Sequence, residues 1–375
     1  MRNPFITNGY AGNEYFCDRK QETDDMRSLL VNENNIAIIS PRRIGKTELI
    51  NHVFDCDEFR TKYHCFLVDI YATQSVSDLV NMLGKAVLEE LKPKGRNAWE
   101  KFVTAIGSIR SEIKFDINGL PSWSVGLGEI RNPIATLDEI FRYLQSADRP
   151  CIVAIDEFQQ ITKYGDATVE ATLRTYVQRT TNAHFIFAGS QRHLMNGMFT
   201  SPSRPFYQSV TIMNLKPLEI EKYIEFADDK FKEGGKRFDP AVLENLYGRF
   251  DGVTSYIHRI LNILYSRTGD GQACSVDMVD PAIDFVVRLS SDTYESLFYQ
   301  MPQKQRSVFL AIASDGKAAE VMSGSFVKRH SLVSASSVSS AIKGLLDKDF
   351  ITNDNGVYSV YDKFFQIWLS KRGLI

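Results

Sequence analysis

The sequence predicts an α/β fold in which a parallel sheet lies between two layers of helices, followed by a helical region and a small terminal domain. Three observations lead to this prediction. Short apolar runs bounded by turn residues recur within the first 214 residues, as in strands buried on both faces of a parallel sheet. Helical periodicity separates these runs. Beyond residue 214 the apolar runs give way to successive helical patterns.

The first run leads into a phosphate-binding pattern. Ile36–Ile39 is apolar, the loop Ser40–Thr47 reads Ser-Pro-Arg-Arg-Ile-Gly-Lys-Thr, and a helical pattern continues from Glu48. A strand, a tight loop and a helix beginning at Gly-Lys-Thr are the layout of a P-loop, or Walker A motif. The usual pattern begins with Gly where this chain has Ser40, but Pro41 favours extended backbone there, for which Gly is not required. The alternative is an ordinary strand-to-helix turn with a surface lysine.

A P-loop assigns a role to each part of this segment. Lys46 would reach the β- and γ-phosphates of ATP as a catalytic cation, and the Thr47 hydroxyl would ligate Mg²⁺. Gly45 would let the backbone approach a phosphate, because it has no Cβ. Contacts with the nucleotide are expected along the loop and into the first helical turn, from Pro41, Arg42, Arg43, Ile44, Gly45, Lys46, Thr47 and Glu48.

A second motif follows another buried run. Pro150–Ile155 is apolar and leads directly into Asp156 and Glu157. Two adjacent carboxylates at the end of a buried strand are costly unless they have a function. In a Walker B motif, Asp156 would hold Mg²⁺ through water and Glu157 would be the catalytic general base for the attacking water. A solvated pair of loop acids fits less well with a P-loop upstream. The two motifs together predict a P-loop NTPase with a three-layer parallel sheet that uses ATP and Mg²⁺.

Further strands are predicted between and after these motifs. Tyr63–Ile70 lies between them, and His184–Ser190 and the weaker Val210–Met213 follow. An intervening strand and a Glu after the Walker B Asp are typical of the P-loop division with additional strands and a catalytic Glu. Ser190 ends the fourth strand, either as a catalytic sensor of the γ-phosphate or attacking water, or as a simple Gly-Ser turn.

The rest of the core is predicted to be helical apart from one insertion. A strand and a helix are expected before residue 32, and another helix is expected around residues 137–144. Alternating runs at 113–117 and 123–127 around an Asn-Gly pair predict a β-hairpin inserted at about 113–127. A helix near Ser77 to Leu91 places on one face Leu79, Met82, Leu83, Val87 and Leu91.

Four segments carry a resemblance to a known family: Phe16–Glu22, Ser40–Thr47, Ile155–Gln159 (Ile-Asp-Glu-Phe-Gln) and Phe187–Ser190 (Phe-Ala-Gly-Ser). In these segments the chain resembles the archaeal-type ATPases, a branch of the AAA+/STAND-like P-loop ATPases. The resemblance spans most of the chain and implies an ATPase core, a helical lid and a C-terminal winged helix. Related lids often carry a Gly-x-Pro-Arg sensor, whereas this chain lacks that Pro and Arg, and Arg259 lies one helical turn further on.

Three domains are therefore expected: an ATPase core over 1–214, a helical lid over 215–290 and a winged helix over 291–375. Lid helices are expected near 219–231, 240–247, 254–265 and 276–289. Winged-helix helices are expected near 303–313, 325–330 and 334–346, the last capped by Ser334, with a hairpin of 350–352 and 357–360. A packing helix is expected to close the chain at 364–369.

The partners of the winged helix are left open. In DNA-binding winged helices the third helix enters the major groove. Here its outward residues are mostly serines with Lys343, and modest positive charge nearby comes from Lys328, Arg329 and His330. Both double-stranded DNA and a protein are therefore kept as candidate partners.

An arginine finger would come from a neighbouring subunit of a homo-oligomer or from a mobile segment. The candidates are Arg174, Arg179, Arg192 and Arg204. Arg204 is favoured as the catalytic one, because its loop resembles the place where the family keeps an arginine; a surface arginine is the alternative for each. We therefore expect hydrolysis to need assembly.

Composition agrees with an enzyme of ordinary globular character. Of the 375 residues, 43% are hydrophobic and 24% charged, and the net charge of −2 supplies no overall basic field for nucleic acid or anionic membrane. No run approaches transmembrane length, so no membrane partner is expected. Five scattered cysteines without a C-x-x-C pair favour reduced thiols in the cytoplasm.

Two functions compete at this point. One is an ATP-hydrolysing switch that couples nucleotide state to the winged helix. The other is a nucleotide-gated module with little intrinsic hydrolysis that recruits DNA or protein. Glu157 favours the first, and the weak second sensor favours slow turnover in an isolated subunit. A nucleotide kinase is disfavoured, because such enzymes usually lack the extra lid and winged helix.

Overall fold

The structure, a computed structural model, describes residues 2–91, 114–115, 121–122, 132–166, 168–354 and 356–375. The chain forms two compact units. The first comprises Ile6–Lys222, and the second comprises Met1–Phe5 together with Tyr223–Ile375. Each unit is described by itself.

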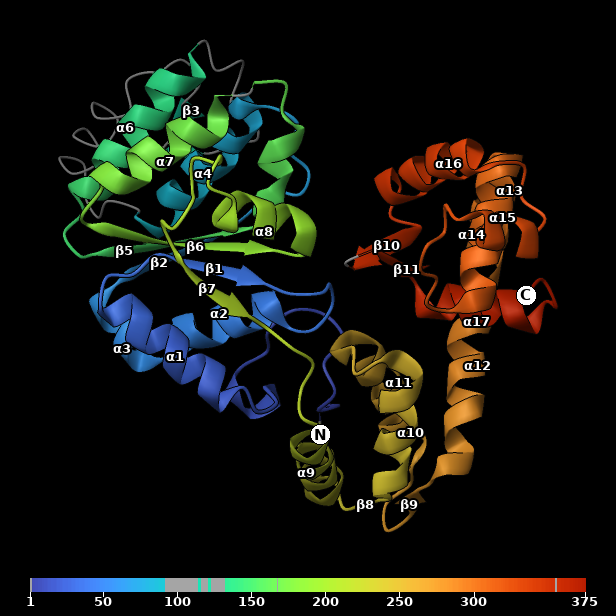
Figure 1. Cartoon of the computed structure of the whole chain (residues 1–375). Coiled ribbons are helices and arrows are strands. Elements are labelled where there is room, and N and C mark those ends of the chain that lie inside the picture. The colour runs from blue at the N-terminus through green and yellow to red at the C-terminus, as the bar shows by residue number, and fades with distance from the viewer. Residues whose placement is uncertain (1, 92–113, 116–120, 123–131, 167, 355) are drawn as a thin grey trace. The chain divides into compact units, whose positions relative to one another are not determined.

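The first unit is built on a five-stranded parallel sheet in the order β2-β5-β6-β1-β7 (Figure 1). All five strands predicted around the motifs are confirmed: β1 (Ile36–Ile39), β2 (His64–Asp69), β5 (Cys151–Asp156), β6 (Ala183–Gly189) and β7 (Thr211–Asn214). The three inner strands are buried along their whole length, as their continuous apolar runs predict. The strand with the weaker signal, β7, is an edge strand that stays partly exposed.

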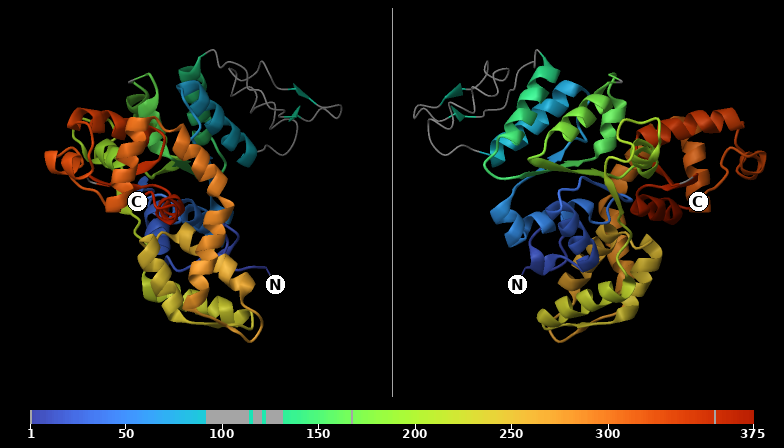
Figure 2. Two further views of the ribbon diagram at one scale, coloured as in Figure 1. Left: turned by 90° about the vertical axis from the view of Figure 1, so that its right-hand side faces the viewer. Right: turned by 60° about the vertical axis from the view of Figure 1, so that its left-hand side comes forward.

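Helices cover both faces of this sheet, which confirms the three-layer arrangement (Figures 1 and 2). One face carries α1 (Lys20–Val31), α2 (Lys46–Asp55) and α3 (Asp57–Lys62). The other carries α4 (Val76–Glu90), α6 (Pro133–Gln145), α7 (Val169–Arg179) and α8 (Arg192–Thr200). Against this second face the core includes four mutually contacting rings, Phe158, Phe187, Phe199 and Phe206.

Two local predictions are wrong. No strand lies between residues 2 and 35; this stretch contains a short 3-10 helix, Asn13–Tyr15, and then α1. Met82 is 37% exposed, whereas its predicted companions on α4 are buried. At 100° per residue, Leu79, Leu83 and Val87 span one arc, and Met82 falls outside it.

Of the predicted hairpin, β3 (Lys114–Phe115) pairs antiparallel with β4 (Pro121–Ser122), and its remainder lies outside the described residues.

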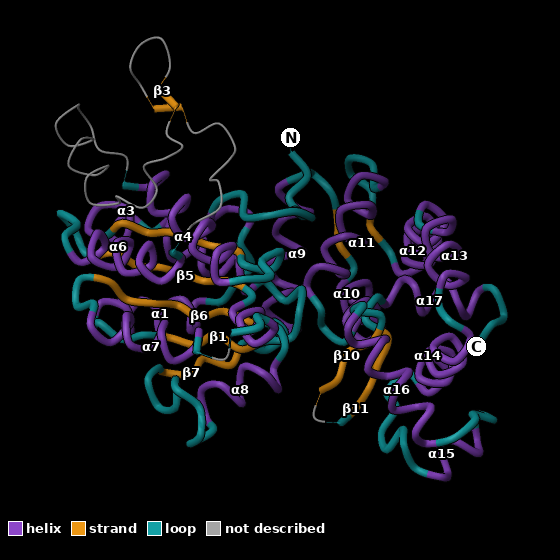
Figure 3. Tube along the Cα trace, turned by 90° about the horizontal axis from the view of Figure 1, so that it is seen from above, coloured by secondary structure: helices purple, strands orange, loops and turns teal. Residues whose placement is uncertain are grey.

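The second unit is mainly helical (Figure 3). Its first part contains most of α9 (Ile220–Glu233), then α10 (Pro240–Phe250), α11 (Thr254–Arg267), a 3-10 turn at Val276–Met278 and α12 (Val279–Leu289). The four helices predicted here are confirmed. A short parallel pair that the sequence analysis missed, β8 (Arg237–Phe238) and β9 (Ala273–Cys274), joins two of the loops.

The end of the chain has the three helices and two-stranded wing of a winged helix. They are α14 (Gln303–Asp315), α15 (Gly324–Arg329), α16 (Ala335–Asp347), β10 (Ile351–Asp354) and β11 (Val357–Val360), followed by α17 (Lys363–Lys371). Ser334 caps α16, because its hydroxyl accepts the Ser337 N–H. An additional helix, α13 (Ser291–Gln300), was not predicted. No helix in the described part of the chain is long and apolar enough to span a bilayer.

Candidate nucleotide-binding site

The predicted motifs meet at the carboxyl ends of three neighbouring strands. Strand β6 lies between β1 and β5, so the loops after all three strands share one edge of the sheet. The Ser40 N–H donates to the Gly189 carbonyl across 3.3 Å and ties the start of the P-loop to the end of β6. In open α/β sheets, ligands bind at this edge.

The P-loop backbone turns through two left-handed residues. Arg43 has φ 67° and Gly45 has φ 93°, and α2 begins immediately after Gly45. A Cβ on Gly45 would meet nothing within 4 Å. Gly45 is therefore favoured by its left-handed backbone conformation, and the close approach to a phosphate expected from the sequence stays a prediction. Pro41 lies at the start of the loop, and Glu48 in the first turn of α2.

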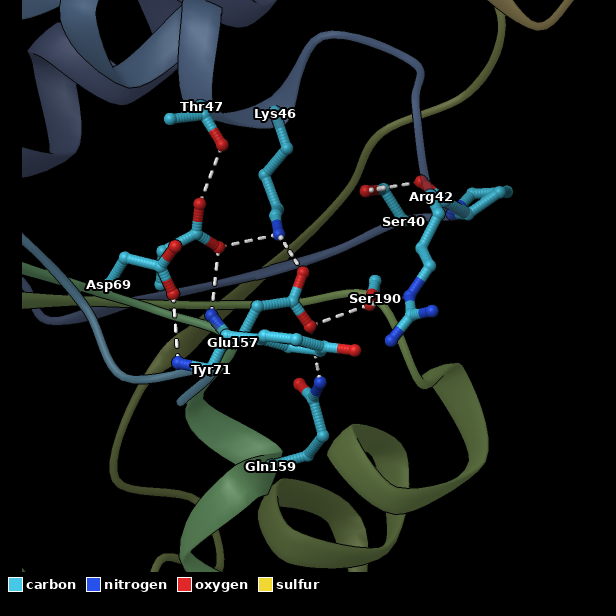
Figure 4. Close-up of polar contacts among 11 residues, drawn as sticks. Ser40, Arg42, Lys46, Thr47, Asp69, Tyr71, Glu157, Gln159 and Ser190 are labelled. Carbon is cyan, nitrogen blue, oxygen red and sulfur yellow. Dashed lines mark hydrogen bonds and ion pairs between the residues drawn. The ribbon is translucent and has the colours of Figure 1, made fainter. Parts of the chain in front are cut away.

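Lys46 and Thr47 (Figure 4), on the first turn of α2, both contact Asp156 at the end of β5. Lys46 Nζ lies 2.6 Å from Asp156 Oδ1, and the Thr47 hydroxyl donates to Asp156 Oδ2 across 2.5 Å. The side chains of Lys46 and Asp156 are each only 8% exposed. Burial alone lowers the pKa of Lys46, but the carboxylates of Asp156 and Glu157 outweigh it, and the pKa is raised above its ordinary value. The Lys46 side chain is therefore protonated at neutral pH.

Glu157 is fixed from three sides. Its Oε1 lies 3.3 Å from Lys46 Nζ, and its Oε2 accepts hydrogen bonds from Ser190 Oγ at 2.7 Å and Gln159 Nε2 at 2.5 Å. Its backbone is left-handed, with φ 56°. Burial alone would raise the pKa of Glu157, but Lys46, the two donors and Arg42 together lower it. Glu157 is therefore ionised at neutral pH, as a general base must be.

Ser190 and Arg42 extend the same network (Figure 4). Arg42 Nε donates to Ser190 Oγ at 3.1 Å, and its guanidinium lies 5.8 Å from the centre of the Tyr71 ring. Ser190 thus joins a P-loop side chain to Glu157, which a simple Gly-Ser turn does not require. An unbroken polar chain now runs through six residues: Thr47, Asp156, Lys46, Glu157, Ser190 and Arg42.

The sequence analysis missed several supporting residues. Arg19, 4% exposed, donates from Nη2 to the Ile44 carbonyl of the P-loop at 3.2 Å and pairs with Glu22 at 2.6 Å. Both residues belong to the Phe16–Glu22 segment, which was the available signal. Position 189 requires glycine, because a Cβ there would overlap the side chains of Gln159 and Met195. At the end of β2, burial and then the nearby Asp156 and Glu157 raise the pKa of Asp69.

The candidate arginine fingers lie on other elements than the P-loop and the ends of β5 and β6. Arg204, in the loop before β7, pairs with Glu170 on α7. Arg174 and Arg179 lie on α7, and Arg192 begins α8. In the second unit, the Arg259 guanidinium lies 5.4 Å from the centre of the Phe364 ring. The side chain of Arg204 thus contacts Glu170 on α7, and that of Arg259 contacts Phe364 within the second unit.

The oxygen atoms at the centre suit a magnesium ion. Thr47 Oγ1 and Asp156 Oδ2 are 2.5 Å apart, and both are hard oxygen donors at the start of the P-loop helix. Mg²⁺ prefers oxygen ligands and usually combines one or two protein groups with waters and substrate phosphates. The residues present therefore fit this ion.

Two family models match the chain. One, described as an ATPase domain predominantly from Archaea, matches residues 16–276. The other, described as a probable winged helix domain, matches residues 292–371. No curated protein matches the sequence.

Solved structures show the same fold at low sequence identity. The Walker-type ATPase PABY2304 of Pyrococcus abyssi is 18% identical with a TM-score of 0.63, over 98% of this chain and 99% of that one. The Aeropyrum pernix ORC2 protein is 13% identical with a TM-score of 0.60, over 100% and 99%. The Aeropyrum pernix ORC1 protein, solved in complex with DNA, is 14% identical with a TM-score of 0.52, over 96% and 94%. These likenesses show the fold, a P-loop NTPase-like core followed by a helical region with a winged helix.

Proposed function

The chain belongs to the family of ATPase domains found predominantly in Archaea, and on that premise we propose that it binds ATP with Mg²⁺ and hydrolyses it. The observation that carries this proposal is the polar chain from Thr47 through Lys46 and Glu157 to Ser190 and Arg42. This polar chain holds a buried ammonium, two oxygen donors and an ionised carboxylate at the edge of one sheet, which supports roles in binding phosphates, in binding a metal and as a general base.

Each residue of the site has a distinct task in this proposal. The P-loop N–H groups and Lys46 bind the phosphates, and Thr47 and Asp156 would hold Mg²⁺. When bound, Mg²⁺ would neutralise part of the phosphate charge. Glu157 accepts a proton from the attacking water as its oxygen bonds to the γ-phosphorus and the bond to the ADP oxygen breaks. Ser190 and Gln159 orient the Glu157 carboxylate through the bonds at 2.7 and 2.5 Å.

We propose that the protein is a molecular switch of the AAA+/STAND-like type that uses ATP hydrolysis. In this proposal the nucleotide state of the core changes the position of the lid and the C-terminal winged helix, which engages double-stranded DNA or a protein. Arg204 acts as an arginine finger in a neighbouring subunit of a homo-oligomer. The DNA-bound ORC1 structure, of the same fold, supports DNA as the first partner to test.

A second function rests on Arg259. Its guanidinium lies over Phe364 within the second unit, and the chain has no Gly-x-Pro-Arg sensor in the lid. This favours a nucleotide-gated binding module with little intrinsic hydrolysis. In that case ATP would be bound tightly and turned over slowly in an isolated subunit.

ATP turnover and binding separate the two functions. Turnover is measured for the wild type, Lys46→Ala and Glu157→Gln, with and without double-stranded DNA, and Glu244→Gln serves as a control that removes an exposed carboxylate of α10. For an ATPase, Glu157→Gln should lower turnover about 10²- to 10⁴-fold while ATP binding persists, and the control should be unchanged. Tight ATP binding by the wild type without turnover would establish the gated module instead.

A further inference from the structure

The second unit contains a positively charged cleft away from the recognition helix of its winged helix. The cleft has a volume of about 660 Å³ and is lined by α12, the end of α11 and α17. Its lining includes four cationic side chains, Arg267, Arg288, Lys371 and Arg372, and one carboxylate, Asp284. Asp284 pairs with Lys371 at 2.5 Å, so that three arginines provide the excess charge.

Each of the three arginines lies over an aromatic ring. The Arg267 and Arg288 guanidinium carbons are 4.8 and 5.7 Å from the centre of the Phe285 ring. The Arg372 guanidinium carbon is 5.5 Å from the centre of the Trp368 ring. Arg288 and Phe285 are three residues apart on α12, and Arg372 and Trp368 are four apart at the end of α17, which places each pair on one helix face.

Hydrogen bonds hold the base of the cleft. The Trp368 indole N–H donates to Ser291 Oγ at 2.9 Å, and Arg372 Nη2 lies 3.4 Å from the same oxygen. Arg267 Nη1 reaches the Pro281 carbonyl at 3.4 Å. A guanidinium stacked on a ring keeps most of its N–H donors free at its edge, so these side chains are pre-organised to bind an anion. At the rim, Glu295 lies 3.7 Å from Arg372 and is 47% exposed, which weakens its effect.

On the recognition side of the winged helix, two of the positive groups are paired with one carboxylate. Arg329 and His330 both pair with Asp315, at 2.5 and 3.0 Å. The exposed outward face of α16 offers serines and Lys343. In the described part of the chain, by contrast, neither Arg267 nor Arg288 takes part in an ion pair. Within the described ranges, Arg267 and Arg288 therefore keep their positive charge without an ion-pair partner, side by side on one wall of the cleft.

We propose that this cleft binds the sugar–phosphate backbone of a nucleic acid. Arginine forks match phosphate oxygens bidentately, and several of them close together suit a chain of phosphates better than a single anion. Phosphate contacts position a nucleic acid without reading its sequence, and the cleft accordingly offers cations and rings rather than amide side chains. The proposal goes beyond ATP hydrolysis and does not depend on it.

Binding of labelled DNA to the full chain tests this proposal. Fluorescence anisotropy measures the affinity for a short duplex, and for one of its single strands, over a range of salt concentrations. The cleft variant carries Arg267→Gln, Arg288→Gln and Arg372→Gln. A matched variant removes three positive charges from the recognition side, through Lys328→Gln, Lys343→Gln and Lys348→Gln, all exposed in the structure.

The two variants have different expected outcomes. The cleft variant should lose roughly tenfold or more in DNA affinity. The slope of log K plotted against log salt concentration should become shallower by about 0.9 for each lost contact with a duplex phosphate. The matched variant should stay within about twofold of the wild type. A charge-conserving variant carries Arg267→Lys, Arg288→Lys and Arg372→Lys and should keep most of the dependence of log K on log salt concentration. Circular dichroism checks that each variant is folded.

Four results would overturn the proposal. The first is a wild type that binds neither the duplex nor the single strand. The second and third are a loss of DNA affinity in the matched variant that exceeds or equals the loss in the cleft variant. The fourth is binding of labelled poly-glutamate through the same three arginines, which would indicate an acidic protein partner. ATP turnover is measured for the same proteins. Loss of turnover in Lys46→Ala with DNA binding intact concerns the ATPase alone, and loss of DNA binding in the cleft variant with turnover intact concerns the cleft alone.

Discussion

Replacement of Lys46 by Met should destabilise the first unit in the absence of nucleotide. Lys46 Nζ lies 2.6 Å from Asp156 and 3.3 Å from Glu157, and the two acids are only 8% and 16% exposed. Removing the cation leaves two adjacent buried carboxylates without their ion-pair partner, and among the described cations only the more distant Arg42 still acts on Glu157. Breaking a buried ion pair in this way typically costs about 3–5 kcal/mol. We expect the lower end of that range, because Glu157 can take up a proton when its positive neighbour is lost.

Hydrogen exchange measures this loss where it occurs. Because the chain has two units, the free energy of opening is followed in peptides covering β5 and β6 rather than by a whole-chain signal. Adding Asp156→Asn to Lys46→Met should recover much of the loss, since one of the unpaired charges is removed. Lys62→Met is the control, because Lys62 is 66% exposed and its pair with Glu58 should contribute no more than about 0.5 kcal/mol. A Lys46→Met protein within about 1 kcal/mol of the wild type would refute the reasoning.

Three further predictions concern the same unit. Arg42→Ala should lower ATP turnover about 10- to 100-fold, the worth of a charge-assisted hydrogen bond, whereas Arg43→Ala should have a smaller effect; equal effects would contradict the role given to the contact with Ser190. The pKa of Glu157 is lowered in the folded state, so its stabilisation is present above its ordinary value of 4.5 and is lost as the pH falls through the folded value. Unfolding measured against pH should therefore show a shallower acid limb in Glu157→Gln, and an unchanged limb would refute this. If Arg204 is a finger in a neighbouring subunit, turnover per subunit should rise with protein concentration, and Arg204→Ala should abolish the rise; Glu170→Gln, which removes its partner within the chain, should not.

The backbone of the site could be predicted because its signals are local. The five strands of the parallel sheet coincide with the predicted apolar runs. Strand β1 leads directly into the P-loop at Ser40, and β5 ends at Asp156. Parallel strands place their carboxyl ends at one edge, so the meeting of the P-loop and Asp156 followed from the fold class. The helices between residues 220 and 289 and the wing were predictable for the same reason, since their periodicity and turn residues lie within each segment.

The side-chain network could not be predicted, because it depends on which strands are neighbours. Arg42 reaches Ser190 only because β6 lies beside β1, and Ser190 reaches Glu157 only because β5 lies on the other side of β6. Sequence patterns identify strands without giving their order. The buried bond from Arg19 to the Ile44 carbonyl is likewise a contact between segments that local patterns do not connect. Helix α13 was missed because only Tyr294 and Phe298 are buried along it, too few for a clear helical periodicity.

The contacts of Lys46 suggest how ATP binding would activate the general base. In the structure Lys46 lies between Asp156 and Glu157, and its charge is the strongest influence that lowers the pKa of Glu157. A Lys46 ammonium drawn toward the β- and γ-phosphates would have its charge compensated there, and the pKa of Glu157 would rise toward the pH at which a base is most effective.

This argument predicts two different acid limbs for the same carboxylate. The acid limb of turnover at saturating ATP reports Glu157 with nucleotide bound, and it should lie at higher pH than the acid limb of stability measured without nucleotide. Arg42 should limit the difference, because it stays beside Ser190 and also lowers the pKa of Glu157. Arg42→Ala should therefore move the turnover limb further upward in pH. Two limbs that coincide in the wild type would mean that Lys46 does not leave Glu157 when ATP binds.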